Sequence, residues 1–329
     1  MGFHTLYCDG LSVEARFPRE RYPKLKASIE IHPMGKNIQW FTPRQAILEE
    51  ITDIHDEQYV QRFIDGSLTP KEKRQIGLRP WNPEIVERTL YLTGGSIQAL
   101  HYAVQSNGYA GNLAGGTHHA FKEHGAGYCI FNDIAIAAIQ AIELGLERVT
   151  VLDLDVHQGD GTASICRDMP NIQTISVHCE KNYPFRKQLS DVDIPLPAMS
   201  EDHTYLIAVD KALEFLREFN PSMVIYQAGV DGLNADRLGK LNLTREGLDQ
   251  NERCKALEFD LQKTLVRIDD QNRVVEQRSY DIRNKGTSLD DTEKEIARVK
   301  DLNTQQNVEI TALRRDVDRV STDCYDYRK

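Results

Sequence analysis

One stretch of this chain, residues 148–161, joins a buried strand to a dense group of acidic and imidazole side chains. Its first part, residues 149–154, is apolar and β-branched without a helical period, which predicts a buried strand of a parallel sheet. Its second part carries side chains that can bind a cation or move a proton: Asp153, Asp155, His157 and Asp160. Because α/β sheets place their sites just beyond the carboxyl ends of strands, the stretch predicts an α/β fold with a functional site at that edge.

Two of these side chains have the spacing of metal ligands. Asp155 and His157 point the same way from extended backbone, because side chains alternate along a strand. A carboxylate and an imidazole could supply two of the three protein ligands of a catalytic zinc ion. The residues alone leave a second interpretation open, in which this is a polar corner whose carboxylates cap nearby backbone amides.

Composition narrows the class of protein and of partner. The chain has 329 residues of which 40% are apolar, enough for a large core. A formal charge of -10 argues against nucleic acid as a direct partner. Six cysteines without a CxxC pair predict free thiols in a reducing compartment, the cytoplasm or the nucleus. The sequence has no long apolar run, so no membrane association is expected.

Strand and helix patterns alternate through the middle of the chain. Strands are predicted at 149–154, 172–177 and 223–227, and helices at 134–144 and from about 200 to 219. This alternation predicts a mostly parallel sheet flanked by helices. A further long helix is predicted over residues 84–106.

The pattern of apolar residues changes after Leu248. We therefore divide the chain into a domain of residues 1–248 and a helix of residues 249–329. Apolar residues there recur every seven positions, which is typical of a coiled coil and predicts a parallel homodimer. The seam is Cys254, Leu261, Ile268, Val275, Ile282, Leu289, Ile296, Asn303, Ile310, Val317 and Cys324. The abrupt change is also what a fusion of two unrelated segments would give.

Four motifs together resemble the zinc-dependent histone deacetylase family, and most closely its class IV and bacterial branch. They are His118-His119, Gly127-Tyr128, the run from Asp153 to Asp160, and the run from Gln227 to Gly239. Their order and spacing match the family over roughly residues 5–248. The resemblance implies an arginase-like α/β fold and zinc chemistry.

The resemblance assigns the zinc ligands to Asp155, His157 and Asp236. Two carboxylates and one imidazole are a set that suits Zn²⁺. The family also binds a structural K⁺ through backbone carbonyls, which here would lie near Ser176 and Val177 as well as the strand end at 153–157.

The catalytic residues implied by the resemblance are His118 and His119, with His119 as the general base. Asp153 and Asp160 would stand behind them, in that order, and fix their tautomers. Gly127-Tyr128 would form one wall of a tunnel for an acyl-lysine side chain. Tyr128 stands where the family usually has phenylalanine.

The resemblance therefore implies hydrolysis of acyl-lysine amides in a histone or another protein. The family completes its site with an oxyanion tyrosine that follows a later strand and a glycine loop, and no such loop follows Leu248. We accordingly expect the sheet to be incomplete at its C-terminal end. Loss of one oxyanion donor typically costs about a hundred- to a thousandfold in rate. The alternative is a non-catalytic deacetylase-like module carried on a dimerising coiled coil.

Overall fold

A computed structural model describes residues 1–14, 17–249, 294, 296–308 and 311–312. The chain divides into two compact units, Met1–Leu243 and Thr244–Lys329. None of the helices in the described part is long and apolar enough to cross a membrane.

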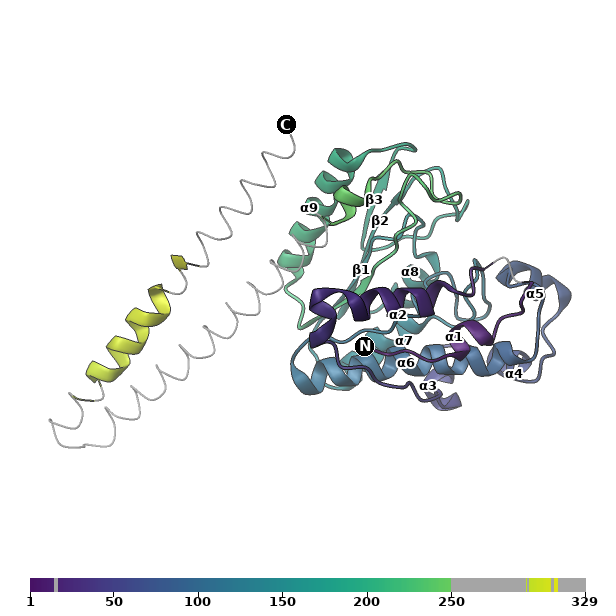
Figure 1. Cartoon of the computed structure of the whole chain (residues 1–329), viewed down its shortest axis with the longest axis horizontal. Coiled ribbons are helices and arrows are strands. Elements are labelled where there is room, and N and C mark those ends of the chain that lie inside the picture. The colour runs from purple at the N-terminus through teal and green to yellow at the C-terminus, as the bar shows by residue number, and fades with distance from the viewer. Residues whose placement is uncertain (15–16, 250–293, 295, 309–310, 313–329) are drawn as a thin grey trace. The chain divides into compact units, whose positions relative to one another are not determined.

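A parallel four-stranded sheet lies at the centre of the first unit, with strand order β3-β2-β1-β4 (Figure 1). Its strands are β1 (Val149–Asp153), β2 (Ile172–Cys179), β3 (Val192–Leu196) and β4 (Met223–Gln227). Every residue of β1 is buried, as a central strand requires. The register places Asp153 level with Ser176 on β2 and Gln227 on β4, so three chain segments leave the sheet side by side. This confirms the predicted parallel sheet.

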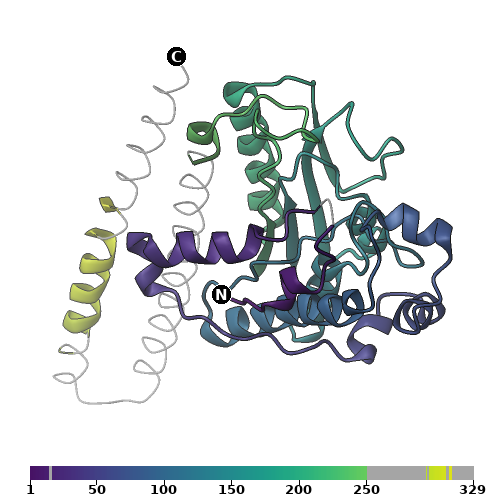
Figure 2. The ribbon, with the colours of Figure 1, turned by 45° about the vertical axis from the view of Figure 1, so that its right-hand side comes forward.

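Helices cover the sheet. Helix α9 (Asp202–Phe219) packs on β2 and β3, whereas α7 (Asp133–Glu143) packs on β1 and β4 (Figure 2). The long helix α6 (Glu84–Ser106) lies against α7 in turn, with the bounds that the sequence predicts. Alanines dominate the buried face of α7, which lets the helix approach the apolar strand β1 closely.

Shorter helices precede α6 and follow β1. They are α1 (Leu6–Asp9), α2 (Arg21–Ile31), the 3-10 helix η1 (Pro33–Asn37), α3 (Leu48–Thr52), α4 (Glu57–Ile64), α5 (Pro70–Ile76) and α8 (Asp160–Cys166). Local sequence determines where helix α5 begins and ends. Thr69 and Glu72 form a capping box, Pro70 begins the helix, and Gly77 ends it with a φ of 85°.

The second unit contains part of the predicted coiled coil. The described residues 294, 296–308 and 311–312 are helical. Of the predicted seam, Ile296 and Asn303 belong to this helix, and the other members lie outside the described residues. The coiled coil and the homodimer therefore stay predictions.

A buried histidine connects two loops of the first unit. His55 is 1% exposed, its Nε2 accepts a hydrogen bond of 2.9 Å from the Asn132 N–H, and its Nδ1 lies 3.3 Å from the Lys122 carbonyl oxygen. Since the Asn132 N–H can only donate, the ring is neutral with its proton on Nδ1. Burial lowers the pKa of His55 to about 4.

This histidine makes folding stability depend on pH. Below about pH 6.5 the unfolded chain protonates His55 while the folded chain does not, so stability is lost as the pH falls towards 4, by up to about 3 kcal/mol. Denaturant unfolding at several pH values should show this slope, and His55→Gln, which keeps an acceptor but does not titrate, should reduce it. The slope that remains comes from other groups, among them His119 and His178, whose pKa values are also lowered to about 4. Equal slopes in both proteins would contradict the assignment.

Candidate metal and catalytic site

Three potential metal ligands converge beyond the carboxyl ends of β1 and β4. One ligand atom each from Asp155, His157 and Asp231 lies within 4.8 Å of the other two. His157 Nδ1 is 3.0 Å from Asp155 Oδ1 and 3.0 Å from Asp231 Oδ2. The pairing of β1 with β4 brings these segments together, and the Val156 N–H donates to Asp231 Oδ1 at 3.0 Å. Two carboxylates and an imidazole are a set that fits a zinc ion.

The electrostatics of this group also favour a cation. Desolvation and the neighbouring Asp155 raise the pKa of Asp231, because two half-buried carboxylates repel each other. Burial lowers the pKa of His157, but Asp155 and Asp231 outweigh it and raise this pKa to about 9. The cluster thus holds a proton where a metal ion could supply the positive charge instead.

Asp236 does not belong to this group, and the predicted third ligand is corrected to Asp231. The Asp236 side chain is exposed, and its Oδ1 accepts hydrogen bonds from the backbone N–H groups of Leu238 at 2.7 Å and Gly239 at 2.9 Å. It caps a loop that turns back so that Leu233 pairs with Leu243. Asp236 therefore caps backbone amides of its own loop. Asp153 and Asp155 have the capping contacts that were left open for the carboxylates after β1, since they accept from the Asp155 N–H at 3.1 Å and the His157 N–H at 2.9 Å.

The two adjacent histidines lie beside the metal-ligand group, each with its carboxylate. His118 Nδ1 is 2.6 Å from Asp153 Oδ2, and His119 Nδ1 is 2.7 Å from Asp160 Oδ1. All four side chains are buried, and the centroids of the two imidazole rings are 4.1 Å apart. The structure therefore contains the two histidine–carboxylate pairs in the predicted order.

The two histidines differ in charge. Burial lowers the pKa of His118, but Asp153 and Asp155 outweigh it and raise this pKa to about 10. For His119, burial and the charge of His118 lower the pKa to about 4, and the hydrogen bond to Asp160 offsets only part of this. At neutral pH His119 is thus the neutral member of the pair and can accept a proton.

Gly127 and Tyr183 lie beside His119, whereas the ring of Tyr128 is exposed and lies next to Gly77. Gly127 and Tyr128 have φ values of 53° and 69°, and the Tyr128 N–H donates to the Ile76 carbonyl oxygen at the end of α5. The Tyr183 ring stands edge-on to the His119 ring, with centroids 4.8 Å apart. Sequence reasoning missed Tyr183, whose only local signal is its place in an aromatic run soon after β2.

Gly127 is predicted to be intolerant of any side chain. A Cβ there would lie 2.6 Å from His119 Cδ2 and 3.0 Å from Tyr183 Cε1, at a φ that L residues rarely adopt. We expect Gly127→Ala to displace the His119 ring and to shift its imidazole ¹⁵N resonances. Gly66→Ala is the matched control, because Gly66 has a φ of 70° and no atom within 4 Å of its virtual Cβ. Both variants should lose about 1 kcal/mol or more of stability from backbone strain, but only Gly127→Ala should shift the His119 resonances. Equal spectra in the two variants would contradict the crowding argument.

The sequence profile of the histone deacetylase domain matches residues 15–266. The chain belongs to the histone deacetylase family. An uncharacterized protein of Picosynechococcus is 42% identical over 76% of this chain and 84% of its own length. The acetoin utilization protein AcuC of Bacillus subtilis is 32% identical over 62% of this chain and 58% of its own, and human histone deacetylase 1 is 30% identical over 68% and 50%. The chain thus spans about half to three fifths of these two named relatives.

Solved structures agree with the family assignment. A histone deacetylase homologue from Aquifex aeolicus superposes with a TM-score of 0.65 at 25% identity, covering 77% of this chain and 73% of that one. An acetylpolyamine aminohydrolase from Burkholderia pseudomallei shares the fold, with a TM-score of 0.60 at 21% identity over 75% and 86% of the two chains. The predicted family and its α/β fold are therefore confirmed for this histone deacetylase homologue.

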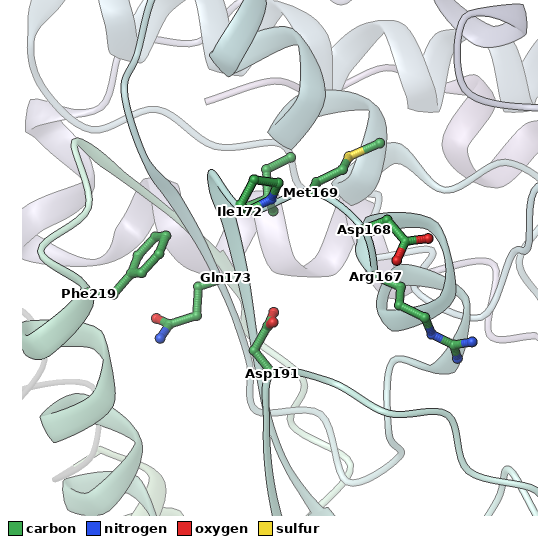
Figure 3. Close-up of a pocket in the computed structure, with 8 residues that line it drawn as sticks. Arg167, Asp168, Met169, Ile172, Gln173, Asp191 and Phe219 are labelled. Atoms are coloured by element: carbon green, nitrogen blue, oxygen red, sulfur yellow. The ribbon is translucent and has the colours of Figure 1, made fainter.

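A cavity of about 380 Å³ lies elsewhere in this deacetylase homologue, between the start of β2 and the end of α9 (Figure 3). Its lining includes Arg167, Gln173, Asp191 and Phe219. Gln173 is the second residue of β2, whereas the metal-ligand group lies beyond the opposite ends of the strands. This cavity is separate from the candidate site.

Proposed function

We propose that this protein is a zinc-dependent deacylase that hydrolyses acyl-lysine amides in proteins. The observation that carries the proposal is the convergence of Asp155, His157 and Asp231 next to two histidine–carboxylate pairs. Amide hydrolysis needs activation of water and of the acyl carbonyl, and a proton for the departing amine. The site holds side chains for each task.

Zinc held by Asp155, His157 and Asp231 would supply Lewis acidity towards the acyl carbonyl and the attacking water. His119 has its Nδ1 proton fixed by Asp160, so its Nε2 lone pair can take the water proton and later return a proton to the lysine amine. His118, protonated beside Asp153, places a positive charge where negative charge develops on the acyl oxygen. Tyr183 and the Gly127 backbone provide an apolar wall for the aliphatic part of acyl-lysine.

Two loops near the site favour a protein substrate over a polyamine. The loop after β2 contacts the loop after β4, since Asn182 Nδ2 donates to the Leu238 carbonyl oxygen and Lys240 Nζ to that of Lys181. Apart from the metal ligand Asp231, these loops carry the cations Lys181, Arg186, Lys187, Arg237 and Lys240, against the acids Glu180, Asp191 and Asp236. A polycationic amine would be repelled by this excess positive charge, whereas acyl-lysine with acidic neighbours would be attracted.

The remaining expectations are part of the same proposal. A reduced rate follows if no tyrosine completes the oxyanion site, and the tyrosines after Leu248 lie outside the described residues. The proposal also includes a structural K⁺, a homodimer through the coiled coil, and a cytoplasmic or nuclear location. The alternative, a non-catalytic module on a dimerising coiled coil, would be contradicted by a monomer whose sedimentation does not depend on concentration.

The proposal is tested by acetate release from three substrates with zinc-loaded and metal-free protein. These are an acetyl-lysine peptide with acidic neighbours, one with basic neighbours, and an acetylated polyamine. We expect zinc-dependent turnover that is fastest for the acidic peptide, with a difference that shrinks as salt screens the loops. Zinc-loaded protein without turnover of any of the three would refute the enzyme and leave the non-catalytic alternative.

A further inference from the structure

Asp133 is a buried carboxylate that the proposed mechanism does not use. It is the first residue of α7, is 2% exposed, and lies beneath the turn that leads into His118 and His119. Its Oδ1 accepts hydrogen bonds from the Thr117 N–H at 2.8 Å and from the Thr117 hydroxyl. Its Oδ2 accepts from the Gly116 N–H at 3.2 Å and from Ser96 Oγ at 2.5 Å. Both oxygens are thus used to hold this turn.

The turn has a shape that favours glycine. Gly115 and Gly116 have φ values of 131° and 72°, in the region that L side chains rarely adopt. A Cβ on Gly115 would lie 2.4 Å from Asp133 Oδ2. The successive N–H groups of Gly116 and Thr117 point at one carboxylate, as they would at a bound anion. The Asp133 carboxylate therefore packs tightly against one side of the turn.

A second polar side chain packs against the other side of the Gly115–Thr117 turn. Gln227, the last residue of β4, donates from Nε2 to the Gly116 carbonyl oxygen at 3.1 Å. A Cβ on Gly116 would lie 2.4 Å from Gln227 Oε1, so turn and carboxamide are in close contact. The same segment continues from Gln227 to the metal ligand Asp231. Asp133 and Gln227 together fix the turn between helix α7 and the strand that leads to this ligand.

We propose that Asp133 is a positioning residue that sets the place of the His118–His119 pair relative to the metal ligands, with Gln227 as the opposing contact. This inference rests on the proposed deacylase function. Asp133 reaches no reacting atom itself. It acts through the backbone of the turn, whose end at Thr117 determines where the next two rings stand.

The test is Asp133→Asn in zinc-loaded protein, because an amide of the same shape would turn a donor towards N–H groups that also donate. We expect kcat to fall about 10- to 100-fold, the range typical for residues that orient functional side chains. KM and zinc affinity should change less than roughly threefold, since Asp155, His157 and Asp231 are untouched. Glu57→Gln is the matched control, because Glu57 is the exposed first residue of α4 and removes the same charge from a helix start without holding a turn. It should leave kcat unchanged.

A second readout does not depend on turnover. In imidazole ¹⁵N spectra, the resonance of the His119 Nδ1–H that donates to Asp160 should shift in Asp133→Asn and stay in place in Glu57→Gln. If wild-type protein shows no turnover, the deacylase proposal fails while this spectrum still decides the positioning role. Should Asp133→Asn not fold, Gln227→Met, which removes the opposing donor, must give the same shift. Unchanged histidine resonances, or a kcat loss equal to the loss of folded protein, would overturn the inference.

Discussion

Zinc binding should be lost when Asp231 is replaced by asparagine and kept when Asp236 is replaced in the same way. Asp231 lies with Asp155 and His157 in one group whose ligand atoms are within 4.8 Å, whereas Asp236 is exposed and bonded to the backbone of its own loop. Changes outside the ligand set of a metal already cost about 10- to 100-fold in affinity, so removing a charged ligand should cost more than about 100-fold. Titration of metal-free protein with zinc against a competing chelator measures both affinities.

The two variants control for each other. They make the same chemical change five positions apart in one loop, so a general effect on charge or on loop stability would weaken zinc binding in both. Asp236→Asn should reduce the melting temperature slightly, because an amide accepts the two backbone N–H groups less strongly than a carboxylate does. If Asp236→Asn abolished binding and Asp231→Asn kept it, the ligand assignment from the structure would be wrong.

Two of the three ligands could be predicted because they lie just beyond a clearly patterned strand. Asp155 and His157 follow the end of β1 at Asp153 by two and four residues, but they lie in a bend and not in the extended backbone that the sequence pattern predicts. The third ligand comes from a longer loop after β4, where the distance from the strand end gives no comparable guide. Both Asp231 and Asp236 follow β4 closely, and only the return of the loop at the Leu233–Leu243 bridge separates their surroundings. The sequence contains no local signal for that return.

Contacts without a local sequence signal also explain why the sequence did not single out the other residues of the site. Tyr183 reaches His119 because the chain turns back after β2, and Asp133 reaches the Gly115–Thr117 turn because α7 begins beneath it. From the sequence, Asp133 is only the residue before the predicted helix of residues 134–144, which is a property of its immediate neighbours. Contacts between segments far apart in sequence decide its second role. The histidine–carboxylate pairing was predicted only because a family resemblance supplied those distant contacts.

Replacing His119 by alanine should lower kcat by about 10² to 10⁴, the usual contribution of a positioned general acid–base. His119 is the neutral histidine of the pair, and the hydrogen bond from its Nδ1 to Asp160 leaves Nε2 open to a water proton. Zinc affinity should stay within roughly threefold, because His119 is not a ligand. His124→Ala is the control: this half-buried histidine lies five residues later, stacks on Phe121, and should leave kcat unchanged.

Asp160→Asn decides whether His119 acts through that carboxylate. Asparagine can present an N–H to Nδ1, which would move the ring proton to Nε2 and leave no lone pair for water. The single change should therefore lower kcat nearly as much as His119→Ala. In the His119→Ala background it should add almost nothing, because a carboxylate that serves only to orient the imidazole has no function once the ring is gone. Fully additive losses would show that Asp160 contributes to the reaction by a separate route, and that the orientation of His119 does not depend on it.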